Sequence, residues 1–365
     1  MRATRAIIWD EIGAQHRHAV EAVDRTLRDI CNNPQPFGGI TVVLGGDFLQ
    51  TLPVVPTGSH EDIVDATIQH SALWEHAEVL RLHQNMRLDQ GDMDAQGFAQ
   101  WLLEVGHGQN MNTNSQIRFP DHMRVDNLES LITSIYPGID SIPPPPPDYF
   151  LNRMILAPHN ADVGDINQKI LECMSGDIHH YVSADEIIRE AGADPLHDDP
   201  IPNEFLRSVH SSSLPPGELN LKIGCPVILL RNLAPSRGLC NGTRMVVTQM
   251  RDRVLEVRLI GGEHDGEVAL IPRVSLIPSA SSADVTFRFR RRQFPVRLTF
   301  ALSINKAQGQ SVQYIGLNLH IPVFAHGQLY VALSRATSSS NIKILLPDDS
   351  TESLAHNVVY DEVLI

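Results

Sequence analysis

The sequence is poor in several features that would define a specialised class of protein. Only 5% of its 365 residues are aromatic, and its four cysteines stand far apart, with no CxxC pair and no zinc-type Cys/His spacing. Neither a disulfide-stabilised secreted fold nor a zinc module is therefore expected. No apolar run approaches the roughly 20 residues of a membrane-spanning helix, and the first residues show no signal-peptide or transit-peptide pattern. We expect reduced thiols in a cytosolic or nuclear protein without membrane attachment.

Charge is unevenly distributed along the chain. The net charge of −14 would by itself argue against a nucleic-acid partner. Residues 1–221, however, carry 13 basic and 32 acidic side chains, whereas residues 222–347 carry 16 basic and only 6 acidic ones. Such an asymmetry favours a polyanionic partner on one side. The densest basic run, Arg288 and Arg290–Arg292, suits phosphate contacts and a solvated strand edge equally well.

Hydrophobic periodicity predicts an α/β chain. Residues 5–9 and 40–44 have the pattern of short buried strands, and a helical stretch at 14–30 lies between them. Strand, helix and strand within so short a segment predict a βαβ unit with a parallel sheet. Further helices are expected at 60–77 and 93–106, because their apolar residues recur at helical spacing.

The second half begins after five consecutive prolines, Pro143–Pro147. Proline fits neither a helix interior nor a central strand, so this segment is interpreted as a linker between domains or as a surface loop. A strand at 153–157 and a helix at 161–174 follow, and the α/β pattern returns at 298–346. The intervening residues 222–300 form short alternating runs broken by glycine, which predicts an inserted β module, a small barrel.

Two predicted strands end in residues that could act on phosphates. IIWDE, residues 7–11, places Asp10 and Glu11 at the carboxyl edge of a parallel sheet, where such sheets bind ligands. In a nucleotide hydrolase, carboxylates at this position hold hydrated Mg²⁺ and orient the attacking water. GGDFLQTLP, residues 45–53, places Gln50 where it could hydrogen-bond a γ-phosphate or that water. Each pattern alone also fits an ordinary strand end or turn.

Three later segments are equally ambiguous when taken singly. Residues 85–87, NMR, contain an arginine that could be a surface charge or could stabilise transferring phosphate. Residues 304–311, INKAQGQS, are polar and suit a loop that binds an anion or a nucleic acid. Residues 326–337, HGQLYVALSRAT, predict a helix with an arginine near its end, and a core helix with one exposed arginine explains them as well.

In this order and spacing, these segments resemble the PIF-type DNA helicases (petite integration frequency family, superfamily one, subclass B), including those carried by Helitron-type transposons. The resemblance runs from about residue 6 to residue 346. IIWDE resembles motif II of the family, GGDFLQTLP motif III, NMR motif IV, FALSINKAQGQS motif V and GQLYVALSRAT motif VI. Residues 221–247 resemble the family's barrel insertion, and residues 157–167 resemble the opening of its second motor domain.

The resemblance implies roles for individual residues. Asp10 would be the carboxylate on the Mg²⁺ side, and Glu11, also at the metal, would be the base that activates water. Gln50 would sense the γ-phosphate. The remaining implied residues are Arg87 and Arg335, which would meet the phosphates from across a cleft, Gly309 at the nucleotide, and His159, Asn160, Lys306 and Gln308 at the DNA.

The fold implied by the resemblance is α/β, with two RecA-like motor domains, the first incomplete, and a small β-barrel inserted in the second. We expect the first motor domain at 1–142, a Pro-rich linker at 143–150, the second motor domain at 151–221 and 298–365, and the barrel at 222–297. The implied activity is ATP-dependent and Mg²⁺-dependent 5′-to-3′ unwinding of DNA in repair, recombination, telomere maintenance or transposon replication. The implied partners are single-stranded and forked or structured DNA. The chain would act as a monomer in the nucleus, with the mitochondrion as a second compartment.

One family motif is missing from the printed sequence. The Gly-rich phosphate loop ending in Gly-Lys-Thr/Ser does not occur, and six residues precede IIWDE. Losing about three charge-assisted hydrogen bonds to phosphate would weaken nucleotide binding by roughly 5–9 kcal/mol. We therefore expect an N-terminally truncated product that hydrolyses ATP barely or not at all and exposes an edge and an apolar face of its first sheet.

Two other functions stay open on the sequence. One is a non-catalytic remnant of such a helicase that still binds single-stranded nucleic acid. The other is an unrelated Mg²⁺-dependent nuclease that would use Asp10, Glu11 and Asp47.

Overall fold

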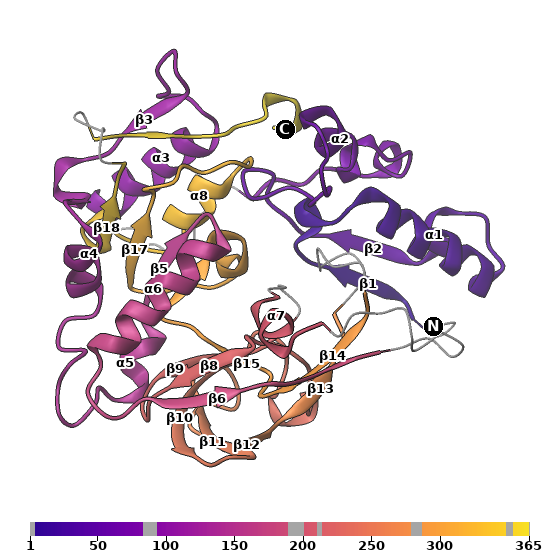
Figure 1. Ribbon diagram of the computed structural model, residues 1–365. Coiled ribbons are helices and arrows are strands. Elements are labelled where there is room, and N and C mark those ends of the chain that lie inside the picture. Colours follow the sequence, from indigo (N-terminus) through magenta and orange to yellow (C-terminus); the bar gives the residue numbers. More distant parts are fainter. Residues whose placement is uncertain are drawn as a thin grey trace. The chain divides into compact units, whose positions relative to one another are not determined.

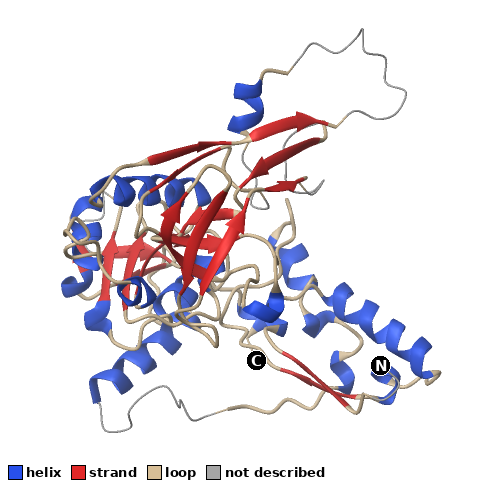
Figure 2. Cartoon of the chain, turned by 90° about the horizontal axis from the view of Figure 1, so that it is seen from below, coloured by secondary structure: helices blue, strands red, loops and turns tan. Residues whose placement is uncertain are grey.

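The computed structural model describes residues 4–82, 93–188, 201–209, 214–278, 287–347 and 353–364 (Figure 1). Backbone contacts divide the chain into two compact units. Unit 1 comprises Met1–Leu131, Leu156–His159 and Ser303–Ile365, and unit 2 comprises Ile132–Ile155 and Asn160–Leu302. Helices and strands occur in both, so the predicted α/β class is confirmed (Figure 2).

Unit 1 begins with the predicted βαβ unit. Strands β1 (Ala6–Trp9) and β2 (Thr41–Leu44) pair in parallel, with Trp9 opposite Leu44. Helix α1 (Arg17–Cys31) connects them and buries Val20 and Leu27. The opposite face of this two-stranded sheet is bare, since Ile8 is 82% exposed and Val43 is 54% exposed. The expected exposure of an apolar sheet face is therefore confirmed.

The predicted helix at 60–77 is shorter than expected. Helix α2 covers only His60–Asp65, and the remainder consists of the 3₁₀ turns η3 (Ile68–His70) and η4 (Trp74–His76). A capping box starts α2: the Ser59 hydroxyl accepts from the Asp62 backbone N–H, and the Asp62 carboxylate accepts from the Ser59 N–H. Helix α3 spans Met93–Gly106, as the sequence predicts.

The second sheet in unit 1 contains three parallel strands, β17 (Tyr314–Asn318), β18 (Ile342–Leu345) and β4 (Arg124–Val125). Beside it, β3 (Gln116–Arg118) pairs antiparallel with β19 (Leu354–His356), and α3 packs against α8 (Gln328–Leu333). The segment from α3 to β4 thus shares sheet and helix contacts with residues 303–364. The expected bounds of the first motor domain, 1–142, stay a prediction.

The boundary between the units runs through two strands of the same sheet, β5 (Arg153–Ala157) and β16 (Ala301–Ser303). In unit 2, helix α6 (Asn160–Cys173) is fixed to β16 by Asn167, whose side chain both donates to the Ala301 carbonyl at 3.0 Å and accepts from the Ala301 N–H at 2.9 Å. Helix α4 (Leu128–Ile135) spans the same boundary nearer the N-terminus.

The five prolines lie inside unit 2 and not between the units. The last of them, Pro147, is the first residue of helix α5 (Pro147–Leu151). Proline is tolerated there because the first N–H groups of a helix have no intrahelical partner. The expectation that no proline of the run joins a helix is thus wrong at Pro147.

In its described residues, the rest of unit 2 consists mainly of antiparallel strands together with the short helix α7 (Asn203–Ser208). A five-stranded sheet has the order β12-β11-β10-β9-β15, a three-stranded sheet has the order β13-β14-β7, and β6 pairs with β8. The bounds are β6 (His179–Val182), β7 (Ala184–Ile187), β8 (Glu218–Leu221), β9 (Pro226–Leu229), β10 (Arg244–Met250), β11 (Val254–Leu259), β12 (Val268–Pro272), β13 (Val274–Leu276), β14 (Phe289–Gln293) and β15 (Val296–Leu298). The predicted β module is therefore present, but it includes β6–β8 from before residue 222. Closure of these sheets into a barrel stays a prediction.

Among the helices in the described ranges, none combines the length and the apolar character needed to cross a membrane.

Candidate nucleotide-binding and DNA-binding site

Two loops meet at the carboxyl edge of the β1–β2 sheet. The Gly45 N–H donates to the Trp9 carbonyl at 2.8 Å, and the Ile12 N–H donates to the Gly45 carbonyl at 2.9 Å. A Cβ atom on Gly46 would lie 2.9 Å from the Ile12 Cγ2 atom. The Gly-Gly pair therefore allows the loop after β2 to lie against the loop after β1, which carries Asp10 and Glu11.

Glu11 has an unusual backbone conformation. Its φ of 56° and ψ of 40° lie in the left-handed region, and its N–H donates to the Asp10 carboxylate at 2.9 Å. A residue other than glycine costs roughly 1–3 kcal/mol in such a strained conformation, and such residues cluster at functional sites. The conformation places the Glu11 side chain against a segment nearly 300 residues later in the chain.

That segment is motif V, and Gln308 makes the contact. Its amide Nε2 donates to the Glu11 Oε2 atom at 2.7 Å, while its Oε1 accepts from the Thr51 hydroxyl at 2.6 Å. Gly309, with φ of +76°, comes next, and a Cβ atom there would lie 3.8 Å from the Glu11 Oε1 atom. Three predicted motifs, II, III and V, thus meet around one carboxylate.

Gln50 lies in the same loop system with one unsatisfied atom. Its Nε2 donates to the Asp47 Oδ2 atom at 3.3 Å, and the Asp47 Oδ1 atom accepts from the Leu49 N–H at 3.0 Å. The Gln50 Oε1 atom is buried and has no hydrogen-bond donor among the described residues. A buried carbonyl oxygen requires a donor, and water can supply one, whereas an ionised phosphate oxygen cannot. The predicted role of orienting the attacking water therefore fits this amide.

The carboxylates fit a magnesium ion that is shared with phosphates. In the described ranges, no three His, Cys, Asp or Glu side chains lie close enough together to hold a metal. Mg²⁺ in nucleotide sites is typically bound through one or two carboxylates together with waters and substrate phosphates. Asp10, which is exposed at the sheet edge, can supply such a carboxylate.

Arg335 is buried beneath motif V and does not project into solvent. It is 4% exposed, and its guanidinium donates to the Val331 carbonyl at 2.9 Å, the Gln310 carbonyl at 3.0 Å and the Ser334 hydroxyl at 2.9 Å. It therefore ties α8 to the segment that contacts Glu11. Its predicted contact with phosphate stays a prediction, and Arg87 lies outside the described residues.

The predicted DNA-binding residues fall into two groups. Lys306 and Asn160, the first residue of α6 in unit 2, are exposed, and His159 is half-buried with its ring stacked on Phe324. Gln308, by contrast, uses its side chain on Glu11 and Thr51. Gln308 thus positions Glu11 in this structure, and its predicted contact with DNA stays a prediction.

Sequence reasoning missed the loop that precedes α8. His326 is 2% exposed; its Nε2–H donates to the Phe48 carbonyl, and its Nδ1 accepts from the Tyr360 N–H, both at 2.8 Å. Burial lowers the pKa of this imidazole, so it stays neutral. A Cβ atom on Gly327 would lie 2.5 Å from the Leu49 carbonyl oxygen. The signal in the sequence was the His-Gly pair immediately before the apolar run of motif VI.

The basic run at 288–292 is divided by the alternation of strand β14. Arg290 and Arg292 are exposed, whereas Arg291 is 1% exposed and forms an ion pair with Asp185 at 3.0 Å. Arg291 is therefore not available to a phosphate. Phosphate contact stays a prediction only for the exposed arginines of the run.

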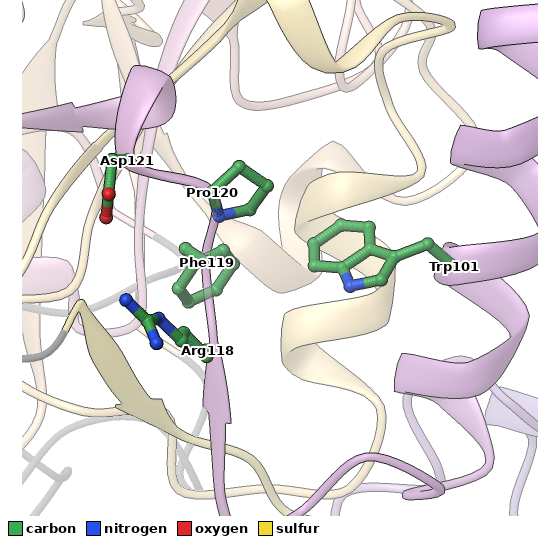
Figure 3. Close-up of a pocket in the computed structure, with 5 residues that line it drawn as sticks. All are labelled: Trp101, Arg118, Phe119, Pro120 and Asp121. Carbon is green, nitrogen blue, oxygen red and sulfur yellow. The ribbon is translucent and has the colours of Figure 1, made fainter.

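A separate shallow pocket of about 250 Å³ lies in unit 1, near α3. Figure 3 shows Trp101 facing Phe119 and Pro120, with the charged ends of Arg118 and Asp121 on the side away from the indole. None of these residues belongs to the predicted motifs.

Comparisons with known proteins agree with the assembled motifs. The model of the PIF1-like helicase family matches residues 1–116, and that of the 2B domain of the DNA helicase Pif1 matches residues 204–250. The chain is similar to the PIF1-like helicases. The ATP-dependent DNA helicase PIF1 of Rattus norvegicus is 28% identical to it over 93% of this chain and 46% of the relative, as is the human protein of the same name. This chain thus spans less than half the length of these PIF1-like relatives.

Solved structures of PIF1-like helicases share the fold. Bacteroides Pif1 bound to single-stranded DNA is similar with a TM-score of 0.65 and 20% identity, over 99% of this chain and 72% of that one. Pif1 helicase from Candida albicans gives a TM-score of 0.61 and 25% identity over 94% and 73% of the two chains. The expected RecA-like fold class is therefore confirmed, and its assignment to particular residue ranges stays a prediction.

Proposed function

We propose that this chain provides the motor core of an ATP-dependent DNA helicase of the PIF type, in which Glu11 is the base for ATP hydrolysis. The observation that carries the proposal is the contact between Glu11 and Gln308, which joins a strand-end carboxylate of motif II to motif V at 2.7 Å. The named relatives support the same activity. The expected substrates are ATP and DNA.

The chemistry follows from the positions of three side chains. ATP with Mg²⁺ would bring the γ-phosphoryl group to the sheet edge near Asp10. Glu11, held through its Oε2 atom by Gln308, keeps its Oε1 atom to accept a proton from the attacking water. The buried Oε1 atom of Gln50 accepts the other hydrogen and fixes the orientation of that water.

The same contact can couple hydrolysis to DNA. Lys306 is exposed two residues before Gln308, so a phosphate drawn to its ammonium acts on the 3₁₀ turn η7 (Ile304–Ala307) that leads into Gln308. Any displacement of Gln308 alters the hydrogen bonds at Glu11 and Thr51. DNA binding would therefore change the geometry of the catalytic base.

The proposed partners are single-stranded and forked DNA, with translocation 5′ to 3′ as a monomer. Exposed Arg290 and Arg292 would add phosphate contacts in unit 2. We further propose work in the nucleus or mitochondrion in DNA repair, recombination, telomere maintenance or transposon replication.

A second proposed function is the binding of single-stranded nucleic acid without ATP turnover. It would use the same exposed basic side chains, Lys306, Arg290 and Arg292, as phosphate contacts.

Phosphate release by the 365-residue polypeptide, measured with Mg²⁺-ATP with and without single-stranded DNA, separates the two functions. A motor should show DNA-stimulated release that falls by about 10²–10⁴-fold in Glu11→Gln and also falls in Gln308→Ala. The matched control is Glu61→Gln, an exposed carboxylate in the first turn of α2. Release equal in wild type and Glu11→Gln, with salt-dependent DNA binding that ATP does not alter, would establish the second function instead.

A further inference from the structure

Phe324 is an exposed aromatic side chain with an ordered support. Phe324 is 56% exposed, and its ring stacks on the His159 ring with centroids 4.8 Å apart and planes inclined by 30°. Leaving a phenyl ring in water forgoes the free energy of burying it. One face of the ring is covered by His159, and the exposed fraction shows that much of the remainder is open.

The loop that carries Phe324 is held by its own hydrogen bonds. The Phe324 and Ala325 N–H groups donate to the Gln328 Oε1 atom at 3.0 and 3.2 Å, and the Gln328 amide donates to the Asn305 Oδ1 atom at 3.1 Å. Gln328 is 1% exposed. The aromatic ring is therefore presented in a fixed position, so little conformational entropy would be lost when a planar ligand stacks on it.

The same hydrogen bonds connect the loop of Phe324 to a segment that carries a cation. Gln328 donates to Asn305, which precedes Lys306 in the chain, and Lys306 is exposed. Aromatic rings and basic side chains together bind single-stranded nucleic acid, because bases stack on the rings while the cations contact the backbone. Duplex DNA offers no unstacked base for such a surface.

We propose that Phe324, supported by His159, stacks on a nucleobase of single-stranded DNA. The inference rests on the proposed function, since it deepens the DNA contact of the same motor. The ring pair would hold one base by its π-face and would tolerate any base, because all four present such a face.

The test is fluorescence anisotropy of a labelled short oligothymidine, with the full 365-residue chain. Base–aromatic stacking predicts that Phe324→Ala weakens binding by about 5- to 150-fold. Phe324→Tyr should bind as the wild type does, and Phe324→Leu, which keeps an apolar side chain without a ring, should behave like the alanine variant. Ile321→Ala, at an exposed apolar residue (42%) of the same loop, is the matched control and should bind as the wild type does.

An abasic oligonucleotide of equal length isolates the stacking. Wild type and Phe324→Ala should bind it equally, because it has no base to stack. If Phe324→Ala and Phe324→Leu bind oligothymidine as tightly as the wild type does while Lys306→Ala weakens it, the stacking site is refuted and the DNA-binding function stands. If the wild type binds no single-stranded DNA at low salt, the proposed function fails and the stacking site fails with it.

Discussion

Arg291 provides the sharpest stability test in unit 2, because the sequence grouped it with solvent-facing arginines. Its Nε donates to both oxygens of Asp185, at 3.2 and 3.1 Å, and its Nη2 donates to the Asp185 Oδ2 atom at 3.0 Å and to the Leu206 carbonyl. Its Nη1 donates to the carbonyls of Val209 and Pro215, both at 3.1 Å. All five N–H groups are therefore used, and one side chain joins β14, β7 and the segment after α7.

Replacing Arg291 by alanine leaves the Asp185 carboxylate, itself 1% exposed in its side chain, without a cation. Removing one partner of a buried ion pair costs about 3–5 kcal/mol. Arg290, the preceding residue, faces Glu186 at 3.8 Å, and both side chains are about half exposed or more. Such a surface pair contributes about 0–1 kcal/mol, so Arg290→Ala is the matched control.

The assay must report on unit 2 alone. All three tryptophans, Trp9, Trp74 and Trp101, belong to unit 1, so their fluorescence does not follow the other unit. Hydrogen exchange with mass spectrometry on peptides covering 184–187 and 203–209 does. Arg291→Ala should lower their protection by about two to four orders of magnitude, whereas Arg290→Ala should leave it nearly unchanged.

A double variant checks the cause. Arg291→Met with Asp185→Leu removes both charges together, so it should recover much of the protection that either single change loses. The reasoning is refuted if Arg291→Ala exchanges no faster than Arg290→Ala.

Three further outcomes are expected. Gly327→Ala should lower the midpoint of the tryptophan-fluorescence melt more than Gly309→Ala does. Both residues have positive φ (71° and 76°), but only at Gly327 would the new Cβ atom lie 2.5 Å from a backbone oxygen. Equal decreases in the midpoint would contradict this explanation. Burial lowers the pKa of His326, so the stability that its neutral ring contributes is complete above about pH 6.5 and is lost as the pH falls through the folded-state pKa. The melting midpoint should therefore fall as the pH is lowered below about 6.5 in the wild type and fall less in His326→Gln; parallel pH profiles would disprove this. Burial also raises the pKa of Cys225 to about 12, so iodoacetamide should alkylate exposed Cys173 in the folded protein and leave Cys225 unmodified, as peptide mass spectrometry would show.

The elements that the sequence predicted well are those with long local patterns. Helix α1, helix α3 and strand β5 each bury a recurrent set of apolar residues. Strands β1 and β2 partly bury every second residue, namely Ile7, Trp9, Val42 and Leu44. The short strand β4 and the antiparallel pair β3 and β19 were missed, because two or three residues show no period and pairing partners far apart in the chain are invisible locally.

The candidate site was predictable in its motifs but not in its contacts. Asp10, Glu11 and Gln50 follow strands, so their meeting at one sheet edge follows from parallel topology. The hydrogen bonds of Gln308 to Glu11 and Thr51 were not predictable in this way. The bond to Glu11 accompanies a left-handed backbone conformation of Glu11 that depends on tertiary contacts. The burial of Arg291 was not predicted for a similar reason. Alternation along β14 shows that one arginine must point inward, but only Asp185 on β7, which is distant in the sequence, compensates the buried charge.

Motif III and the proposed base-stacking loop share a continuous set of contacts. His326 bonds to the Phe48 carbonyl, and Gly327 lies against the backbone of Leu49 and Gln50. Phe324 stands only two residues before His326. A shift of Gln50 on loss of a γ-phosphate would therefore press on the loop that carries the aromatic ring, because closely packed backbone cannot move without displacing its neighbours. The affinity of Phe324 for a nucleobase would then depend on whether the γ-phosphate is present, through this packing as well as through Gln308.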